Sequence, residues 1–259
     1  MLGAIVGDII GSVYEFNNFK TEHPEEVELF NTDAKFTDDS VMTIAVADAI
    51  LTGKDYADAA DDWGNRYPWS GYGSRFIQWL AVKEKKPYNS WGNGSAMRVS
   101  PIGWAFETLE ETMAQAKRSA EFTHNHPEGV KGAQATCAAV FLARTGASKQ
   151  EIKSHIEQKF DYDLDRTIVE IRPAYRFNES CQRTVPEAVI VFLESEDFLH
   201  AMKLAVSIGG DTDTLACITG GIAEAFYKGV PTELAVFAEN RLDPPMRTVL
   251  SAFRNKYLK

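Results

Sequence analysis

Apolar residues follow a helical pattern through most of the chain, and turn-forming residues separate the apolar segments. The segment 38–51 is rich in Ala, Val and Ile and stops at Thr52-Gly53, a typical signal for a helix C-terminus. The pattern predicts an almost entirely helical protein, with weak strand candidates only at 27–30 and 167–172. The other long apolar segments predict helices over 56–63, 76–82, 109–122, 127–144, 197–208, 213–227, 232–241 and 244–257.

Capping boxes predict where two further helices begin. Ser148 and Glu151 form one box, and Thr184 and Glu187 form another, which opens a helix over 186–194. Breaker residues between the helices predict loops, where binding residues concentrate on a rigid scaffold. These loops span 14–37, 64–75, 85–103, which we expect to be irregular from residue 87 onward, and 123–128.

Length and composition favour a protein with one sizeable core. The chain has 259 residues, of which 44% are hydrophobic, and no linker divides it, so residues 1–259 are expected to form a single domain. No apolar stretch approaches the roughly 18 residues that a membrane span needs. The N-terminus lacks the basic leader of a signal peptide, so we expect no membrane association.

Cysteine usage and charge narrow the function classes. Cys137, Cys181 and Cys217 are scattered and odd in number, which favours free thiols in a cytoplasmic protein and excludes a CxxC zinc site. The net charge of −10 disfavours broad binding to nucleic-acid backbones, but a small anionic ligand held by metals and helix N-termini stays compatible with it.

Two acidic clusters far apart in the chain match each other in kind. Thr37-Asp38-Asp39-Ser40 and Asp211-Thr212-Asp213-Thr214 each combine two carboxylates with hydroxyls, just ahead of an apolar helical segment. Such oxygens are the ligands of hard divalent cations. Helix capping would explain either cluster alone. A cap needs one acceptor, however, and Gly209-Gly210 lets the second cluster approach a ligand closely. We therefore expect the clusters to converge on a metal centre, most simply a dinuclear one.

Three other segments carry candidate chemistry. Gly7 and Gly11 share a helix face and predict a tight helix–helix contact, while Glu15 follows them and could face a pocket. The Gly/Ser/Asn segment 90–98 could form an anion-binding nest or an ordinary turn. His124 and His126 precede a Pro-started helix, which suggests either a zinc pair or a helix cap beside one ligand-facing histidine.

In their order along the chain, these motifs resemble those of the ADP-ribosylglycohydrolase family over nearly the whole sequence. The resemblance runs through Gly7-Asp8-x-x-Gly11 with Glu15, the two acidic clusters, the segment 92–98 and Thr123-His124. It implies an all-α orthogonal helical bundle with two Mg²⁺ or Mn²⁺ ions in a central cleft.

The resemblance also implies roles for individual residues. The matching positions of relatives of the type-3 kind imply that Glu15 contacts metal and substrate. The implied catalytic residues are Glu15, Asp38 and Asp213, and the implied metal ligands are Thr37, Asp38, Asp39, Asp211, Asp213 and Thr214. The implied substrate-binding residues are Ser90, Trp91, Gly92, Asn93, Gly94, Ser95, Met97 and His124.

The implied reaction is hydrolysis of the bond between C1″ of ADP-ribose and a modified protein side chain, arginine or serine. Glycoside cleavage passes through an oxocarbenium-like transition state, which Glu15 or a metal-bound Asp would assist as general base. The sequence leaves open an ADP-ribosylated nucleic acid or small molecule, a nucleotide phosphohydrolase and a non-catalytic ADP-ribose binder. It does not indicate an oligomeric state, or the role of residues 160–183.

Overall fold

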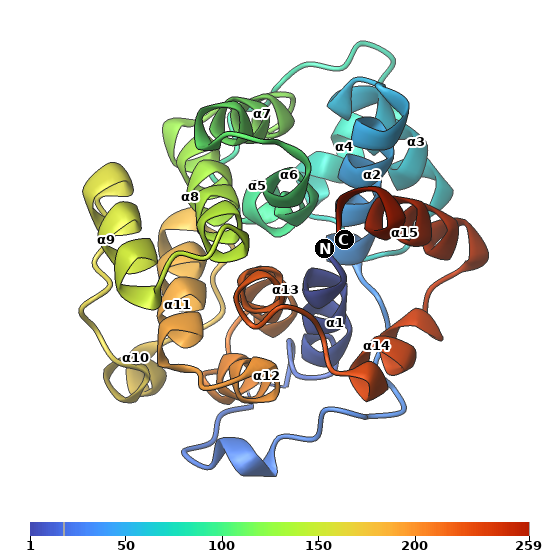
Figure 1. Ribbon diagram of the computed structural model, residues 1–259. Helices are drawn as coiled ribbons and strands as arrows, with labels where there is room; N and C mark the ends of the chain where they lie inside the picture. Colours follow the sequence, from blue (N-terminus) through green and yellow to red (C-terminus); the bar gives the residue numbers. More distant parts are fainter. Residues whose placement is uncertain (18, 259) are drawn as a thin grey trace.

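The computed structural model describes residues 1–17 and 19–258, and within them the fold is all-helical with no β-strand (Figure 1). None of the helices in these residues combines the length and the apolar composition that a bilayer crossing requires. The helices are α1 (Leu2–Gly11), α2 (Asp38–Thr52), α3 (Tyr56–Arg66), α4 (Ser74–Ala81), α5 (Gly94–Met97), α6 (Ser100–Ala105), α7 (Leu109–Glu121), α8 (Pro127–Arg144), α9 (Lys149–Phe160), α10 (Ile168–Ala174), α11 (Cys181–Glu194), α12 (Phe198–Ser207), α13 (Thr212–Phe226), α14 (Thr232–Glu239) and α15 (Pro244–Tyr257), with a short 3₁₀ turn, η1 (Pro24–Glu26).

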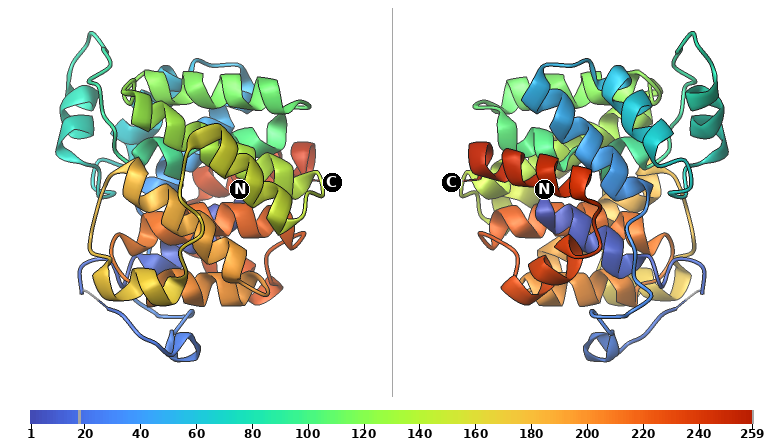
Figure 2. Two further views of the ribbon diagram at one scale, coloured as in Figure 1. Left: turned by 90° about the vertical axis from the view of Figure 1, so that its left-hand side faces the viewer. Right: turned by 90° about the vertical axis from the view of Figure 1, so that its right-hand side faces the viewer.

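Helix α13 occupies the centre of the bundle. Figure 1 shows it beside α1 and surrounded by α8, α11 and α12, all of which contact it. All ten residues of α1 are buried, as are those of α13 from Thr212 to Ala225. The first and last thirds of the sequence therefore meet in the core, and the long connection with η1 runs along the outside (Figure 2).

Glycines on α1 allow this contact between α1 and α13. A Cβ atom on Gly7 would overlap the carbonyl oxygen of Ala216, and one on Gly11 would overlap that of Thr212. The predicted tight helix–helix contact is therefore confirmed. Because the backbones approach so closely, the C-terminal end of α1 is held against the N-terminal end of α13.

Helix limits set by local signals agree with the predictions. Gly53 ends α2 in the left-handed conformation, with φ of 74°. Ser148 and Glu151 form both bonds of the capping box that opens α9. Helices α8 and α15 have the predicted limits, 127–144 and 244–257.

Four local predictions are wrong. The segment 167–172 is not a strand, because Thr167 and Glu170 form a capping box that starts α10, and residues 27–30 form no strand either. Helix α11 starts at Cys181 and contains Pro186, so Thr184 does not cap it. The segment 87–103 is not irregular throughout, since it contains α5 and the start of α6.

The Thr184 side chain forms hydrogen bonds outside α11, which explains why the predicted second capping box does not form. Its hydroxyl donates to the carbonyl of Asn178 at 3.1 Å and accepts from Asn93 Nδ2 at 3.1 Å. Glu187 instead forms an ion pair with Arg166, with 2.7 Å between the Oε1 and Nη1 atoms. Both side chains thus join α11 to other segments rather than satisfying its first turn.

Candidate metal and substrate site

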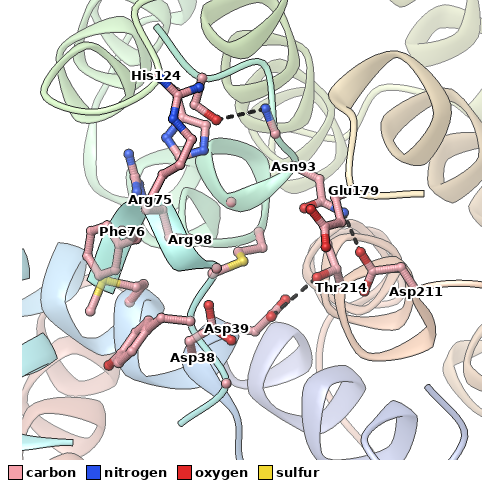
Figure 3. Close-up of a pocket in the computed structure, with 18 of the residues that line it drawn as sticks. Asp38, Asp39, Arg75, Phe76, Asn93, Arg98, His124, Glu179, Asp211 and Thr214 are labelled. Atoms are coloured by element: carbon pink, nitrogen blue, oxygen red, sulfur yellow. Dashed lines mark hydrogen bonds between the residues drawn. The ribbon is translucent and has the colours of Figure 1, made fainter. Parts of the chain in front are cut away.

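The two acidic clusters converge on one pocket, as expected from their matching composition (Figure 3). The first turn of α2 brings Asp38 and Asp39, and the start of α13 brings Asp211 and Asp213. The hydroxyl of Thr214 donates to Asp39 Oδ2 at 3.3 Å, so the two helix N-termini are in direct contact. Glu15, which follows the end of α1, lines the same pocket.

Carboxylate oxygens gather here at metal-ligand spacing. One oxygen each from Asp8, Asp39 and Asp213 lie within 4.8 Å of one another, and the same holds for Glu15, Asp211 and Asp213. Asp213 belongs to both groups and so joins them. Two adjacent groups of oxygen ligands match the requirements of hard divalent cations.

Burial and mutual repulsion make the free carboxylates unstable as anions. Burial, followed by the charge of Asp213, raises the pKa of both Asp38 and Asp39 well above the usual range. Burial, followed by Asp211, does the same to the pKa of Asp213. Among the described residues, no ion pair includes any of these aspartates.

The donor set therefore fits divalent cations. Among the described residues, Asp39 Oδ1 is buried without a hydrogen-bond partner, which would cost free energy unless a cation binds there. Burial also raises the pKa of Asp211 to about 6, although the amide of Asn93 donates to its Oδ2 at 2.7 Å. Cations at the two oxygen groups would offset the desolvation and the repulsion together.

Asp8 supports the site, although no role was predicted for this residue from the sequence. It is fully buried on α1 and accepts from Thr37 N at 3.0 Å, Thr37 Oγ1 at 2.6 Å, Ser40 N at 3.0 Å and the Ser40 hydroxyl. It thereby fixes the turn that presents Asp38 and Asp39. The signal in the sequence that could have indicated this role is a single acidic residue within an apolar helical segment. Thr37, an expected metal ligand, caps α2, and its hydroxyl donates to Asp8. Thr37 is not among the residues that line the pocket.

Glu15 is half-buried beside the second oxygen group. Burial, followed by the charge of Asp213, raises the pKa of Glu15 to about 8. Its carboxylate is within 4.8 Å of ligand atoms of Asp211 and Asp213. The position suits a group that exchanges a proton with a molecule held at the metal ligands.

The segment 90–97 forms one wall of the pocket. Its loop is joined to the start of α11, since Asn93 N donates to Glu179 O at 2.7 Å and Cys181 N donates to Trp91 O at 3.0 Å. Ser90, Gly92, Asn93, Gly94 and Met97 line the pocket. Two predicted contacts point elsewhere: the ring of Trp91 packs on His126, and the Ser95 hydroxyl donates to Gly129 O at 2.7 Å.

The two histidines have different positions, which agrees with the predicted helix cap beside one pocket histidine and not with a zinc pair. The His126 side chain caps α8 by accepting from Glu128 N, and His124 lines the pocket. Burial, followed by the charges of Arg98 and Arg75, lowers the pKa of His124 well below its usual range, so the ring is neutral. A Cβ on Gly94 would lie 3.3 Å from His124 Nε2, so a larger residue there would press on the histidine ring.

Two arginines give the histidine end of the pocket a positive charge (Figure 3). The buried guanidinium of Arg98 donates to Ser119 O at 2.7 Å, and that of Arg75 donates to Tyr88 O. Within the part of the chain that the structure describes, neither guanidinium forms an ion pair. The pocket is thus bipolar, with carboxylates at one end and cationic donors suited to an anion at the other.

Comparisons with known proteins agree with this architecture. A model of the family described as ADP-ribosylglycohydrolase matches residues 1–251. The chain is 26% identical over 304 residues to the ADP-ribosylhydrolase ARH3 of Mus musculus, covering 88% of this chain and 82% of that protein. It is 26% identical over 267 residues to the ADP-ribosylarginine hydrolase Tri1 of Pseudomonas putida, covering 90% and 71%.

A solved structure shares the fold. The structure titled ADP-ribosylglycohydrolase-related protein complex aligns with a TM-score of 0.72 at 23% identity and covers 98% of this chain and 96% of its own. Since the family model spans nearly the whole sequence, the chain belongs to the ADP-ribosylglycohydrolase family.

Proposed function

We propose that this protein is a metal-dependent hydrolase that removes ADP-ribose from a modified protein side chain by cleaving the glycosidic bond at C1″. The observation that carries the proposal is the bipolar pocket, in which a carboxylate cluster fitted for divalent cations faces an end lined by guanidinium groups. The relatives named as an ADP-ribosylhydrolase and an ADP-ribosylarginine hydrolase support the same reaction. Because both ends of the chain contribute, we also propose that residues 1–259 form one domain.

Two Mg²⁺ or Mn²⁺ ions would occupy the carboxylate end. The proposed ligands are Asp39, Asp211 and Asp213 from the two oxygen groups, with Asp38 and Thr214, which line the same pocket, and with Glu15 beside them. When bound, such ions polarise ribose hydroxyls and lower the pKa of a bound water.

The chain's own residues orient the substrate. Arg75, His124 and the segment 90–94 would hold the diphosphate at the cationic end, which leaves the terminal ribose against the carboxylates. Asn93 links the two ends of the pocket, because its side chain donates to Asp211 while its backbone belongs to the segment 90–94.

Glu15 would act as the general base. In the proposed step a water oxygen bonds to C1″, the bond from C1″ to the acceptor atom breaks, and the proton taken by Glu15 ends on the departing group. A positioned base contributes about 10²–10⁴-fold in rate.

The test is release of ADP-ribose from peptides ADP-ribosylated on arginine or on serine, with Mg²⁺ or EDTA and products identified by mass. We expect intact ADP-ribose in Mg²⁺ only, and almost none from Asp38→Ala or Asp211→Ala. Asp58→Ala is the matched control, because Asp58 is exposed in the first turn of α3. AMP as product would indicate a phosphohydrolase, and ADP-ribose binding without turnover would indicate a binder.

A further inference from the structure

The pocket has an aromatic rim on the side of Glu15. Phe16 follows Glu15, and Phe177 lies in the connection between α10 and α11, yet their rings stack with centroids 6.2 Å apart and an interplanar angle of 29°. Phe16 is 83% exposed and Phe177 is 44% exposed. Phe177 lines the pocket, so two segments remote in sequence place apolar ring surface at its mouth.

Glu179 adds a carboxylate to this rim. It lines the pocket two residues after Phe177, and its backbone is fixed because its carbonyl accepts from Asn93 N at 2.7 Å. Among the described residues, no ion pair includes Glu179. Figure 3 shows it on the side of Asp211 and Thr214, across the pocket from Arg75 and His124.

The polarity of the pocket indicates what meets this rim. If the diphosphate is held at Arg75 and His124, and the terminal ribose at the aspartates, the group attached to C1″ extends past Glu15. The surface that it reaches there consists of the stacked rings and the carboxylate of Glu179.

A guanidinium group matches both features. It is planar and weakly hydrated, stacks on aromatic rings, and pairs with a carboxylate through two parallel N–H donors. The hydroxymethyl group of serine is small and neutral, so it would leave the ring face uncovered and Glu179 without a cation.

We propose that Phe16, Phe177 and Glu179 form an acceptor subsite for a guanidinium group, and that the substrate is ADP-ribose linked to arginine. This inference rests on the proposed function and names its substrate class. The step balances: the C1″–N bond breaks, water supplies the hydroxyl to C1″, and the water proton ends on the departing nitrogen. The guanidinium charge is unchanged, so Glu179 pairs with substrate and product alike.

The first experiment compares three substrates: an arginine-linked peptide, a serine-linked peptide and a neutral aryl glycoside of ADP-ribose. We expect the wild type to favour the arginine peptide over the serine peptide. Glu179→Gln should lower the ratio of kcat/KM for the arginine peptide to that for the aryl glycoside about fivefold, mainly through KM. Phe177→Ala should lower the ratio about threefold. Glu110→Gln, an exposed carboxylate in the first turn of α7, should leave it unchanged.

A second measurement uses agmatine, which carries a guanidinium without a carboxylate, as an inhibitor of aryl glycoside cleavage. We expect competitive inhibition in the wild type that weakens about fivefold in Glu179→Gln and at high salt.

The outcomes separate this inference from the proposed function. Metal-dependent cleavage of the aryl glycoside and the serine peptide, without the arginine peptide, would refute the subsite and leave the hydrolase. An equal effect of Glu179→Gln on all substrates would give the residue a structural role and also refute the subsite. If no substrate is cleaved, the proposed function fails and the inference falls with it.

Discussion

Replacing Asp8 tests whether the turn that carries the proposed metal ligands Asp38 and Asp39 depends on the buried carboxylate behind it. Asp8→Ala removes the acceptor for two backbone N–H groups and two hydroxyls, contributed by Thr37 and Ser40. Hydrogen bonds to a charged group contribute about 1.5–3 kcal/mol each, so four give an upper bound of about 6–12 kcal/mol. A buried donor left without an acceptor costs about 1–3 kcal/mol, and the two hydroxyls can turn to other acceptors, so we expect a loss of about 4 kcal/mol with Mg²⁺ bound.

Asp8→Asn is the matched variant, because it keeps the shape and one acceptor oxygen while removing the charge. The amide oxygen can still accept from Ser40, and the Thr37 hydroxyl can turn to accept from the amide nitrogen. We expect a loss of about 1–2 kcal/mol in the free energy of unfolding.

The assay is thermal unfolding with saturating Mg²⁺ and with EDTA. Since 1 kcal/mol corresponds to about 2–4 °C for a protein of this size, Asp8→Ala should melt about 10 °C below the wild type in Mg²⁺. In EDTA the gap should narrow, because the variant loses one of several repelling carboxylates around Asp39 and Asp213. The reasoning would be refuted by Asp8→Ala melting within about 2 °C of the wild type in Mg²⁺, or by both variants being equally destabilised.

Three further predictions concern metal and packing. Because the buried aspartates have raised pKa values, the metal-free folded state binds more protons than the unfolded state, and its stability falls as pH rises above about 4. Mg²⁺ should therefore raise Tm more at pH 8 than at pH 5, and an equal rise at both pH values would contradict this. Gly7→Ala should cost about 3 kcal/mol in chemical denaturation, because its Cβ overlaps the Ala216 carbonyl, against about 1 kcal/mol for Gly53→Ala at an open helix end; equal losses would count against the close contact. Ser148→Ala should cost about 1 kcal/mol by breaking the box with Glu151, and no change in Tm would make that cap irrelevant to stability.

Helix limits could be predicted wherever a neighbouring residue sets them. Gly53 ends α2, and Ser148 starts α9, through contacts within a few residues, so the sequence alone carries the signal. Thr184 was misread because its hydroxyl serves Asn93 and Asn178, and that use depends on tertiary packing. A capping pattern therefore predicts a helix start only when its side chains have no competing partner in the fold.

The candidate site could be predicted in part for a similar reason. The aspartates at 38, 39, 211 and 213 lie in dense acidic motifs, which can be recognised in the sequence without knowledge of the fold. Arg75 and Glu179 carry no local motif, and only the packing of α4 and the start of α11 brings them to the same pocket. Sequence reasoning thus reaches the residues proposed for the reaction more readily than those proposed for specificity.

The close packing of α1 on α13 links the two halves of the candidate metal site. Gly11 admits the backbone at Thr212, and one turn earlier Asp8 fixes the start of α2, so a single buried helix positions both acidic clusters. A shift of α1 along α13 would move Asp38 and Asp39 relative to Asp213 and so change the spacing of the oxygen ligands. Metal affinity in this protein should therefore respond to substitutions on the glycine face of α1 that contact no ligand, and Gly7→Ala should weaken Mg²⁺ binding as well as stability.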